Sequence, residues 1–178
     1  MAGRTLENLD SIDRKILAAL QQDGRLTNSD LAKEVSLSPT PTLERVKRLE
    51  RDGFIEKYVA ILSADKMDAG LVAFVEVVLD RTTEDVLERF ALAATQTPEI
   101  MECHMVAGGF DYLLKIRVRD MDGYRKFLGS GLAGLPGVRA THTYMVMEQV
   151  KVATALPVEP PVIRSGSPRR EAKHRATS

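Results

Sequence analysis

The sequence is poor in several of the residues that define specialised protein classes. It has one cysteine, Cys103, and three histidines among 178 residues, too few for an internal disulfide or a multi-cysteine metal site. No run reaches the roughly 18 to 20 uncharged apolar residues of a membrane span, and residues 1–15 contain no hydrophobic secretory segment. These absences exclude disulfide scaffolds and zinc fingers, and we expect a cytoplasmic protein that does not enter a membrane.

An excess of charge of one sign is also missing, because 25 Lys and Arg balance 25 Asp and Glu. The balance varies along the chain: basic minus acidic residues give 0 for 1–62, −3 for 63–155 and +3 for 156–178. Hydrophobic residues make up 44% and charged residues 28%, as in ordinary globular proteins. Any nucleic-acid interaction must therefore come from local placement of charge and not from overall charge.

Three short helices are predicted near the N-terminus. Asp10 is a candidate N-cap before apolar residues at helical spacing, and Thr27 is a candidate N-cap for a helix over 28–35. Ser38 precedes a third helix whose two prolines fall in its first turn, where they remove only unpaired N–H groups. Gly53 supplies the left-handed position that ends it. This pattern is typical of a helix-turn-helix domain, in which the third helix enters the DNA major groove.

The predicted third helix has an apolar side and a polar side. Leu43, Val46 and Leu49 form the packing side, and the opposite side carries hydroxyls and cations that suit phosphates and bases. Arg48 is suited to guanine, whereas Arg45 is either a phosphate contact or a solvated charge. Spacing alone also fits a structural three-helix module. The candidate DNA-contacting residues are Ser38, Thr40, Pro41, Thr42, Arg45, Lys47, Arg48 and Arg51.

Strand and helix patterns alternate in the rest of the chain. Strand-like runs at 71–79, 100–107, 110–119 and 138–150 alternate with helical periods in the order β-α-β-β-α-β. This order predicts a four-stranded antiparallel sheet with two helices on one face. Residues 54–62 are also rich in strand formers, and 156–178, with four prolines and no aromatic residue, predict a flexible basic tail.

Catalytic chemistry finds no support in the sequence. Cys103 and His104 occupy adjacent strand positions and point to opposite faces, so they are unsuited to a Cys-His dyad. His142 is most simply a residue of a sheet face. No phosphate-binding loop, nucleophile motif or paired metal-ligand motif is present. We therefore predict no enzyme activity, no catalytic residues, no metal and no cofactor.

Several long stretches resemble the Lrp/AsnC family of bacterial and archaeal transcription regulators. The similarity covers roughly residues 8 to 155, and residues past 156–157 depart from the family pattern. It is carried by residues 9–17, 37–41, 43–51, 53–55, 102–104, 108–115, 135–138 and 143–148.

The resemblance implies an α+β protein with two functional domains. A winged helix-turn-helix would bind double-stranded DNA and a βαββαβ ferredoxin-like (ACT-like) domain would bind an amino-acid effector, leucine-like most plausibly, between dimers. Homodimers would assemble into tetramers or octamers that regulate amino-acid metabolism genes on the nucleoid. The implied domains are 1–54 for DNA binding, 55–65 as linker strand and hinge, 66–155 for effector binding and oligomerisation, and 156–178 as tail.

The resemblance also names an effector site. Glycine N–H groups suit a carboxylate, Asp111 suits an ammonium group or orders the loop, and methionines suit an aliphatic side chain. Taken alone, Gly108-Gly109 is more simply a turn and Asp111 a turn or capping residue. The alternatives are an effector-independent architectural DNA-binding protein and an amino-acid-binding regulatory subunit of an enzyme. The implied effector residues are Met105, Gly108, Gly109, Phe110, Asp111, Tyr112, Met121, Tyr144, Met145 and Val146.

Overall fold

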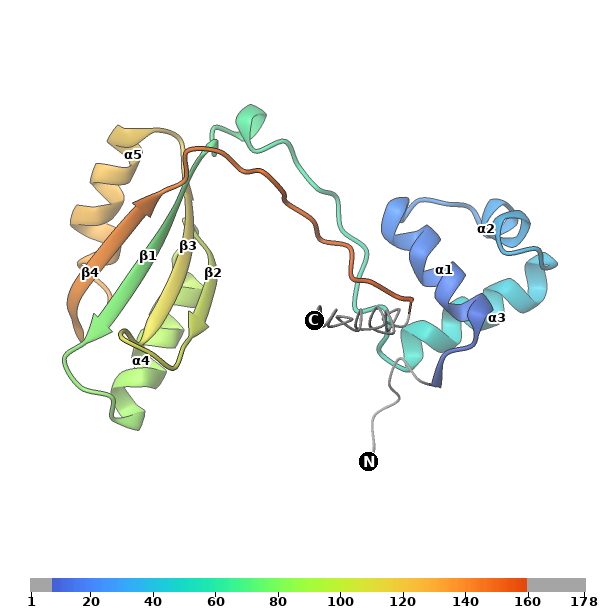
Figure 1. Ribbon diagram of the computed structural model, residues 1–178, viewed down its shortest axis with the longest axis horizontal. Helices are drawn as coiled ribbons and strands as arrows, with labels where there is room; N and C mark the ends of the chain where they lie inside the picture. The colour runs from blue at the N-terminus through green and yellow to red at the C-terminus, as the bar shows by residue number, and fades with distance from the viewer. Residues whose placement is uncertain (1–7, 160–178) are drawn as a thin grey trace, which may run out of the picture. The chain divides into compact units, whose positions relative to one another are not determined.

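A computed structural model describes residues 8–159, and these form two units (Figure 1). One unit comprises residues 60–152, and the other combines 8–59 with 153–159. Most of the tail expected at 156–178 lies outside the described residues. The elements in chain order are α1 (Ser11–Gln22), α2 (Asn28–Glu34), α3 (Pro39–Arg51), η2 (Asp65–Met67), β1 (Leu71–Leu79), α4 (Glu84–Gln96), β2 (Ile100–Met105), β3 (Tyr112–Val118), α5 (Met121–Lys126), η3 (Phe127–Leu132) and β4 (Val138–Met145).

The three N-terminal helices begin at the predicted caps. The Asp10 carboxylate accepts a hydrogen bond from the Asp13 backbone N–H at 2.8 Å, and Thr27 accepts one at the start of α2. Ser38 occupies the N-cap of α3 without a side-chain cap bond, and Gly53 follows that helix with φ +78°. Between α2 and α3, Ser36 adopts φ 58°, which turns the chain sharply. The predicted order of helices and turns is confirmed.

Residues 153–159, which follow the second unit in the chain, pack against the three helices and belong to the helical unit. We call them the return segment. Val158 packs against the apolar core of the three helices. Gln21, near the end of α1, bonds to the Leu156 backbone in both directions, at 3.0 and 2.6 Å. A hollow of about 470 Å³ remains where the return segment meets the helices. It is lined by Lys15, Ala18, Ala19, Gln21, Gln22, Glu34, Ala155, Leu156, Pro157 and Val158.

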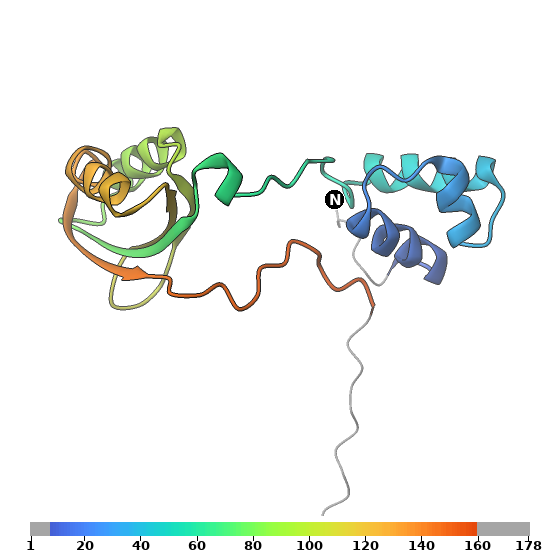
Figure 2. The ribbon, with the colours of Figure 1, turned by 90° about the horizontal axis from the view of Figure 1, so that it is seen from above.

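The second unit is the predicted βαββαβ arrangement. Its four antiparallel strands lie in the order β2-β3-β1-β4, so the first and third strands occupy the centre. Buried residues alternate along β1 and β3, as period-two burial on one face requires. Figure 2 shows α4 and α5 on the same side of this sheet. The apolar core lies between that side and the helices, with Val75, Phe90, Leu114 and Ile116 fully buried.

Three local expectations are wrong. Residues 54–62 contain no strand, and Tyr58, Val59, Ile61 and Leu62 are exposed, because no strand lies beside them among the described residues to complete the hydrogen bonds. The strands around Gly108-Gly109 are shorter than predicted and are joined by a six-residue loop, 106–111, in which Val106 N–H donates to Asp111 O. The last strand ends at Met145, well before residue 150.

Candidate nucleic-acid interface

The inward side of α3 differs from the predicted side at one position. Thr42 is fully buried, and its hydroxyl donates to the Ser38 carbonyl at 3.0 Å. Leu49 is buried as expected, whereas Leu43 keeps 41% of its surface exposed. The prediction that the Thr42 hydroxyl faces DNA is therefore wrong, because that hydroxyl is already bonded inside the fold. Leu43 stands at the surface in its place.

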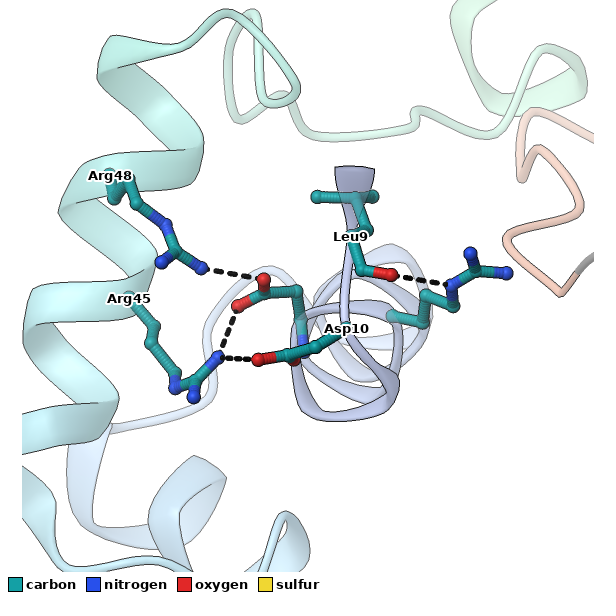
Figure 3. Close-up of polar contacts among 6 residues, drawn as sticks. Leu9, Asp10, Arg45 and Arg48 are labelled. Carbon is teal, nitrogen blue, oxygen red and sulfur yellow. Dashed lines mark hydrogen bonds and ion pairs between the residues drawn. The ribbon is translucent and has the colours of Figure 1, made fainter. Parts of the chain in front are cut away.

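Two arginines of α3 turn towards α1 and meet one buried carboxylate. Asp13, with 3% of its side chain exposed, accepts from Arg45 Nη1 at 2.8 Å and from Arg48 Nη2 at 2.6 Å. Arg45 also donates to Asp10 Oδ2 at 2.6 Å. Figure 3 shows Arg45 and Arg48 reaching from α3 to the carboxylates at the start of α1. These four residues, the α1–α3 charge cluster, carry no net charge.

The cluster shifts the pKa values of two of its members, Asp10 and Arg45. Burial alone would raise the pKa of Asp10, but hydrogen bonds from the Asp13 backbone N–H and from Arg45 outweigh it and lower that pKa below 3.8. The hydrogen bonds to Asp10 and Asp13 raise the pKa of the Arg45 guanidinium. Both shifts favour the charged forms of Asp10 and Arg45, so their ion pair is maintained at neutral pH.

The remaining predicted DNA-contacting residues lie on or beside the outer side of α3. Ser38, Thr40 and Lys47 are exposed, and Pro41 is half-buried at the first turn. Arg51 is exposed and lies 3.7 Å from Asp52. Arg45 and Arg48 keep 25% and 37% of their side chains exposed, so each presents part of its guanidinium to solvent. The basic outer side thus combines surface cations with two arginines that are already paired.

The implied effector residues lie at two ends of the sheet. The Asp111 N–H donates to Val77 O near the end of β1, whereas the Val146 N–H donates to Val72 O near its start. Five residues of strand separate these points by roughly 17 Å, which exceeds the reach of one free amino acid. Within a single chain, the implied effector residues therefore cannot all contact the same amino acid. The hairpin group is Met105, Gly108, Gly109, Phe110, Asp111 and Tyr112, and the opposite group is Met121, Tyr144, Met145 and Val146.

Two members of the hairpin group have roles within the fold. Asp111 Oδ2 accepts from the Leu79 N–H at 2.7 Å, so this carboxylate caps the end of β1. Tyr112 is buried against Phe90, with ring centroids 4.4 Å apart. Its hydroxyl is buried without a partner among the described residues, and burial raises its pKa. The structural role of Asp111 is thus observed, and the Tyr112 side chain is not at the surface of the hairpin.

The residues considered for catalysis are separated as predicted. Cys103 faces the core side of the sheet, where burial raises the pKa of its thiol, and His104 is exposed on the other side. His104 lies 3.3 Å from Glu102, which also pairs with Lys115 at 2.7 Å. Within residues 8–159, no group of three or more acidic, histidine or cysteine side chains is arranged to hold a metal ion. No helix in this range is long and apolar enough to cross a bilayer.

Sequence reasoning missed Asp13 and Gln21 as organising residues. Asp13 is an acidic residue on the inward side of an amphipathic helix, a signal that buried pairing is required. Its partners lie 32 and 35 residues away, so periodicity could not name them. Gln21 carries no such signal, because exposed glutamines are common at helix ends.

Comparison with known proteins identifies both units. Residues 9–56 match the winged helix-turn-helix DNA-binding model, and residues 72–156 match the Lrp/AsnC ligand binding domain. The leucine-responsive regulatory proteins of Salmonella typhimurium and of Escherichia coli K12 are each 55% identical over 153 residues. Each match covers 86% of this chain and 93% of the relative.

Two solved structures match most of the chain. A transcriptional regulator from Neisseria meningitidis in complex with L-Met aligns with TM-score 0.80 at 39% identity. An AsnC family transcriptional regulator from Agrobacterium tumefaciens aligns with TM-score 0.81 at 36% identity. Each match covers 84% of this chain and 97% of the solved chain.

Proposed function

This chain belongs to the Lrp/AsnC family of transcription regulators, and we propose that it binds specific operator DNA through the outer side of α3 in response to an amino acid. The observation that carries this proposal is the exposed Lys47 and Arg51 on a helix held by a helix-turn-helix. Such a helix enters the major groove, where cations bind phosphates and exposed side chains meet base edges. The proposed DNA-contacting set is the exposed Ser38, Thr40, Leu43, Lys47 and Arg51, the half-buried Pro41, and the outer N–H groups of Arg45 and Arg48.

The DNA contact is tested with a duplex that the wild-type protein selects from a random pool. Lys47→Gln is expected to weaken binding of the selected and of a scrambled duplex alike, because a phosphate contact carries no sequence information. The slope of log K against log salt should fall by about one. Lys126→Gln, an exposed lysine of α5, is the matched control and should leave the slope unchanged. Equal slopes for all three proteins would contradict the assignment.

We place the effector carboxylate at the Gly108-Gly109 hairpin. Neither glycine has a positive φ, and a Cβ built at either meets nothing within 4 Å. Neither turn geometry nor packing inside the chain therefore requires glycine, which favours close approach by a ligand or a second chain. Relatives named for a leucine response and a relative solved with L-Met support an apolar amino acid.

Size-exclusion chromatography with light scattering tests the effector. The wild type should change its mass distribution with leucine, methionine or a similar amino acid from a panel of twenty at millimolar concentration. Gly109→Ala should abolish the change, and Gly129→Ala, whose added Cβ also meets open space, should retain it. If no amino acid shifts the wild type, the effector proposal fails and effector-independent architectural DNA binding is favoured.

We propose that homodimers form through the sheet side opposite α4 and α5 and assemble further into tetramers or octamers. No helix of residues 60–152 covers this side, which carries Phe74, Leu113 and Tyr144. The two segments that join the units also expose apolar side chains, more than an isolated chain normally leaves in water. The exposed residues are Tyr58, Val59, Ile61, Leu62, Met147, Val150 and Val152. As a DNA-binding regulator, the protein would act in the cytoplasm, on the nucleoid.

A further inference from the structure

The α1–α3 charge cluster is placed where it would affect DNA binding as well as folding. Arg45 and Arg48 extend from α3, and both donate to the same Asp13 carboxylate on α1. The two arginines are three positions apart, so they lie on neighbouring turns of one side of α3. Each guanidinium therefore donates to Asp13 through one of its terminal nitrogens, and its other N–H groups remain available to solvent or a ligand.

We propose that Asp13 is a positioning residue for DNA recognition, which holds Arg45 and Arg48 away from phosphates and cancels half of their charge, so that binding depends on sequence. This inference rests on the proposed contact through α3. An unpaired arginine binds any phosphate, which increases affinity for all DNA equally. An arginine whose guanidinium is held by an ion pair has a fixed orientation, and a bidentate contact with guanine requires a guanidinium in a fixed orientation.

Asp10 contributes the second half of the neutralisation. Its carboxylate bonds Arg45 from the rim of the cluster, where 51% of the side chain is exposed, while its other oxygen caps α1. Asp10 thus tunes the charge of Arg45 without being buried. Asp10→Asn therefore removes the negative charge and should leave α1 intact, because asparagine is an equally good N-cap.

The test compares Asp13→Asn and Asp10→Asn with the wild type on two duplexes, the selected sequence and its scrambled form. Both variants should bind the scrambled duplex more tightly, with the log K against log salt slope steeper by about 0.9 for each added phosphate contact. The ratio of selected to scrambled affinity should fall about tenfold for Asp13→Asn, as expected when a bidentate base contact is lost. A smaller fall is expected for Asp10→Asn.

Two controls separate this role from a purely structural one. Glu34→Gln removes one negative charge from an exposed residue of the same unit and should leave the affinity ratio unchanged. Asp13→Asn combined with Arg48→Gln restores a neutral cluster and should return the salt slope to the wild-type value.

Several results would overturn the inference. If both asparagine variants lose affinity for the two duplexes in equal proportion, with unchanged slopes, Asp13 acts only in folding. Should Asp13→Asn fail to fold, Asp10→Asn alone decides, since an unchanged slope and ratio there would contradict the proposal. A wild-type protein that does not discriminate between the duplexes would instead refute the proposed function.

Discussion

Gln21 and Leu156 exchange two hydrogen bonds although 135 positions separate them in the chain. Gln21 Nε2 donates to the Leu156 carbonyl at 3.0 Å, and the Leu156 N–H donates to Gln21 Oε1 at 2.6 Å. One side chain thus satisfies both backbone groups of a residue that has no strand or helix partner. The chain consequently passes twice between its two units, once after α3 and once after β4.

Gln21→Ala is expected to release the return segment from α1. The bonds are exposed, so the loss of unfolding free energy should be modest, about 1 kcal/mol. The Leu156 amide should exchange its hydrogen faster, because its acceptor is removed. Hydrogen exchange and urea denaturation followed by circular dichroism measure both effects. Gln22→Ala, also exposed on α1, should change neither, and equal exchange rates in the two variants would contradict the role given to Gln21.

Local signals predicted most of the fold. Caps such as Asp10 and Thr27, the glycine after α3 and the alternation along β1 depend on neighbouring residues, and the structure has them where expected. The prediction for the inward side of α3 is wrong at one position, because Thr42 is buried where Leu43 was expected, whereas Val46 and Leu49 pack inward as predicted. Leucine is the more apolar choice, but Thr42 can satisfy its hydroxyl within its own helix turn.

Features that depend on distant partners were not predictable. The pairing of Asp13 with two arginines turns that side of α3 towards α1, and no pattern within one helix contains this information. Residues 156–159 were predicted to belong to a tail because 156–178 is rich in proline and has no aromatic residue, yet Leu156 bonds to Gln21 of α1 and Val158 packs against the core of the three helices. The effector residues were predicted from family resemblance, and their separation into two groups follows from strand register.

Removal of the two arginines alone should cost more stability than removal of the arginines together with Asp13. The double variant Arg45→Met, Arg48→Met leaves the Asp13 carboxylate buried without its cations, and we expect a loss of about 3 kcal/mol or more at pH 7. Adding Asp13→Leu should recover most of this loss, because apolar groups of similar volume often replace a buried ion pair without destabilising the fold.

Urea denaturation of the double and triple variants measures the difference. Should the double variant lose less than about 1 kcal/mol, Asp13 would not depend on these arginines. The triple variant should remain folded while losing discrimination between DNA sequences, which separates stability from recognition.

The lowered pKa of Asp10 predicts a pH-dependent contribution to stability. Folding favours the ionised carboxylate of Asp10, so this carboxylate stabilises the fold at pH values above its unfolded pKa of 3.8. The stabilisation is lost as the pH falls through the lower pKa that Asp10 has in the folded protein. Asp10→Asn should therefore be less stable than the wild type at pH 7 by a few tenths of a kcal/mol, since half of the side chain is exposed and screened. Urea titrations at fixed ionic strength should show the difference shrinking as the pH falls below 3.8 and vanishing in strong acid. Persistence of the same difference in strong acid would exclude the ionic explanation.

Tyr112→Phe tests whether the buried hydroxyl belongs to the fold or to the effector. The hydroxyl has no partner among the described residues, so its removal should leave stability unchanged or raise it by up to about 1 kcal/mol. The ring should keep its contact with Phe90. The amino-acid response measured by light scattering should also be retained, because Tyr112 is buried away from the hairpin surface. Loss of the response with full stability would instead assign the hydroxyl to effector binding.

Two glycine-to-alanine changes in the same unit should act in opposite directions. Gly137 has φ +73°, and an added Cβ would lie 2.7 Å from Val86 Cγ1, so Gly137→Ala combines backbone strain with a clash against α4. We expect a loss of about 1 to 3 kcal/mol. Gly129 lies in the helical segment η3 with open space at its Cβ, and alanine there should stabilise by up to about 1 kcal/mol through reduced backbone entropy of the unfolded chain. Thermal unfolding of both variants checks the signs, and a Gly137→Ala protein as stable as the wild type would show that the turn before β4 relaxes without cost.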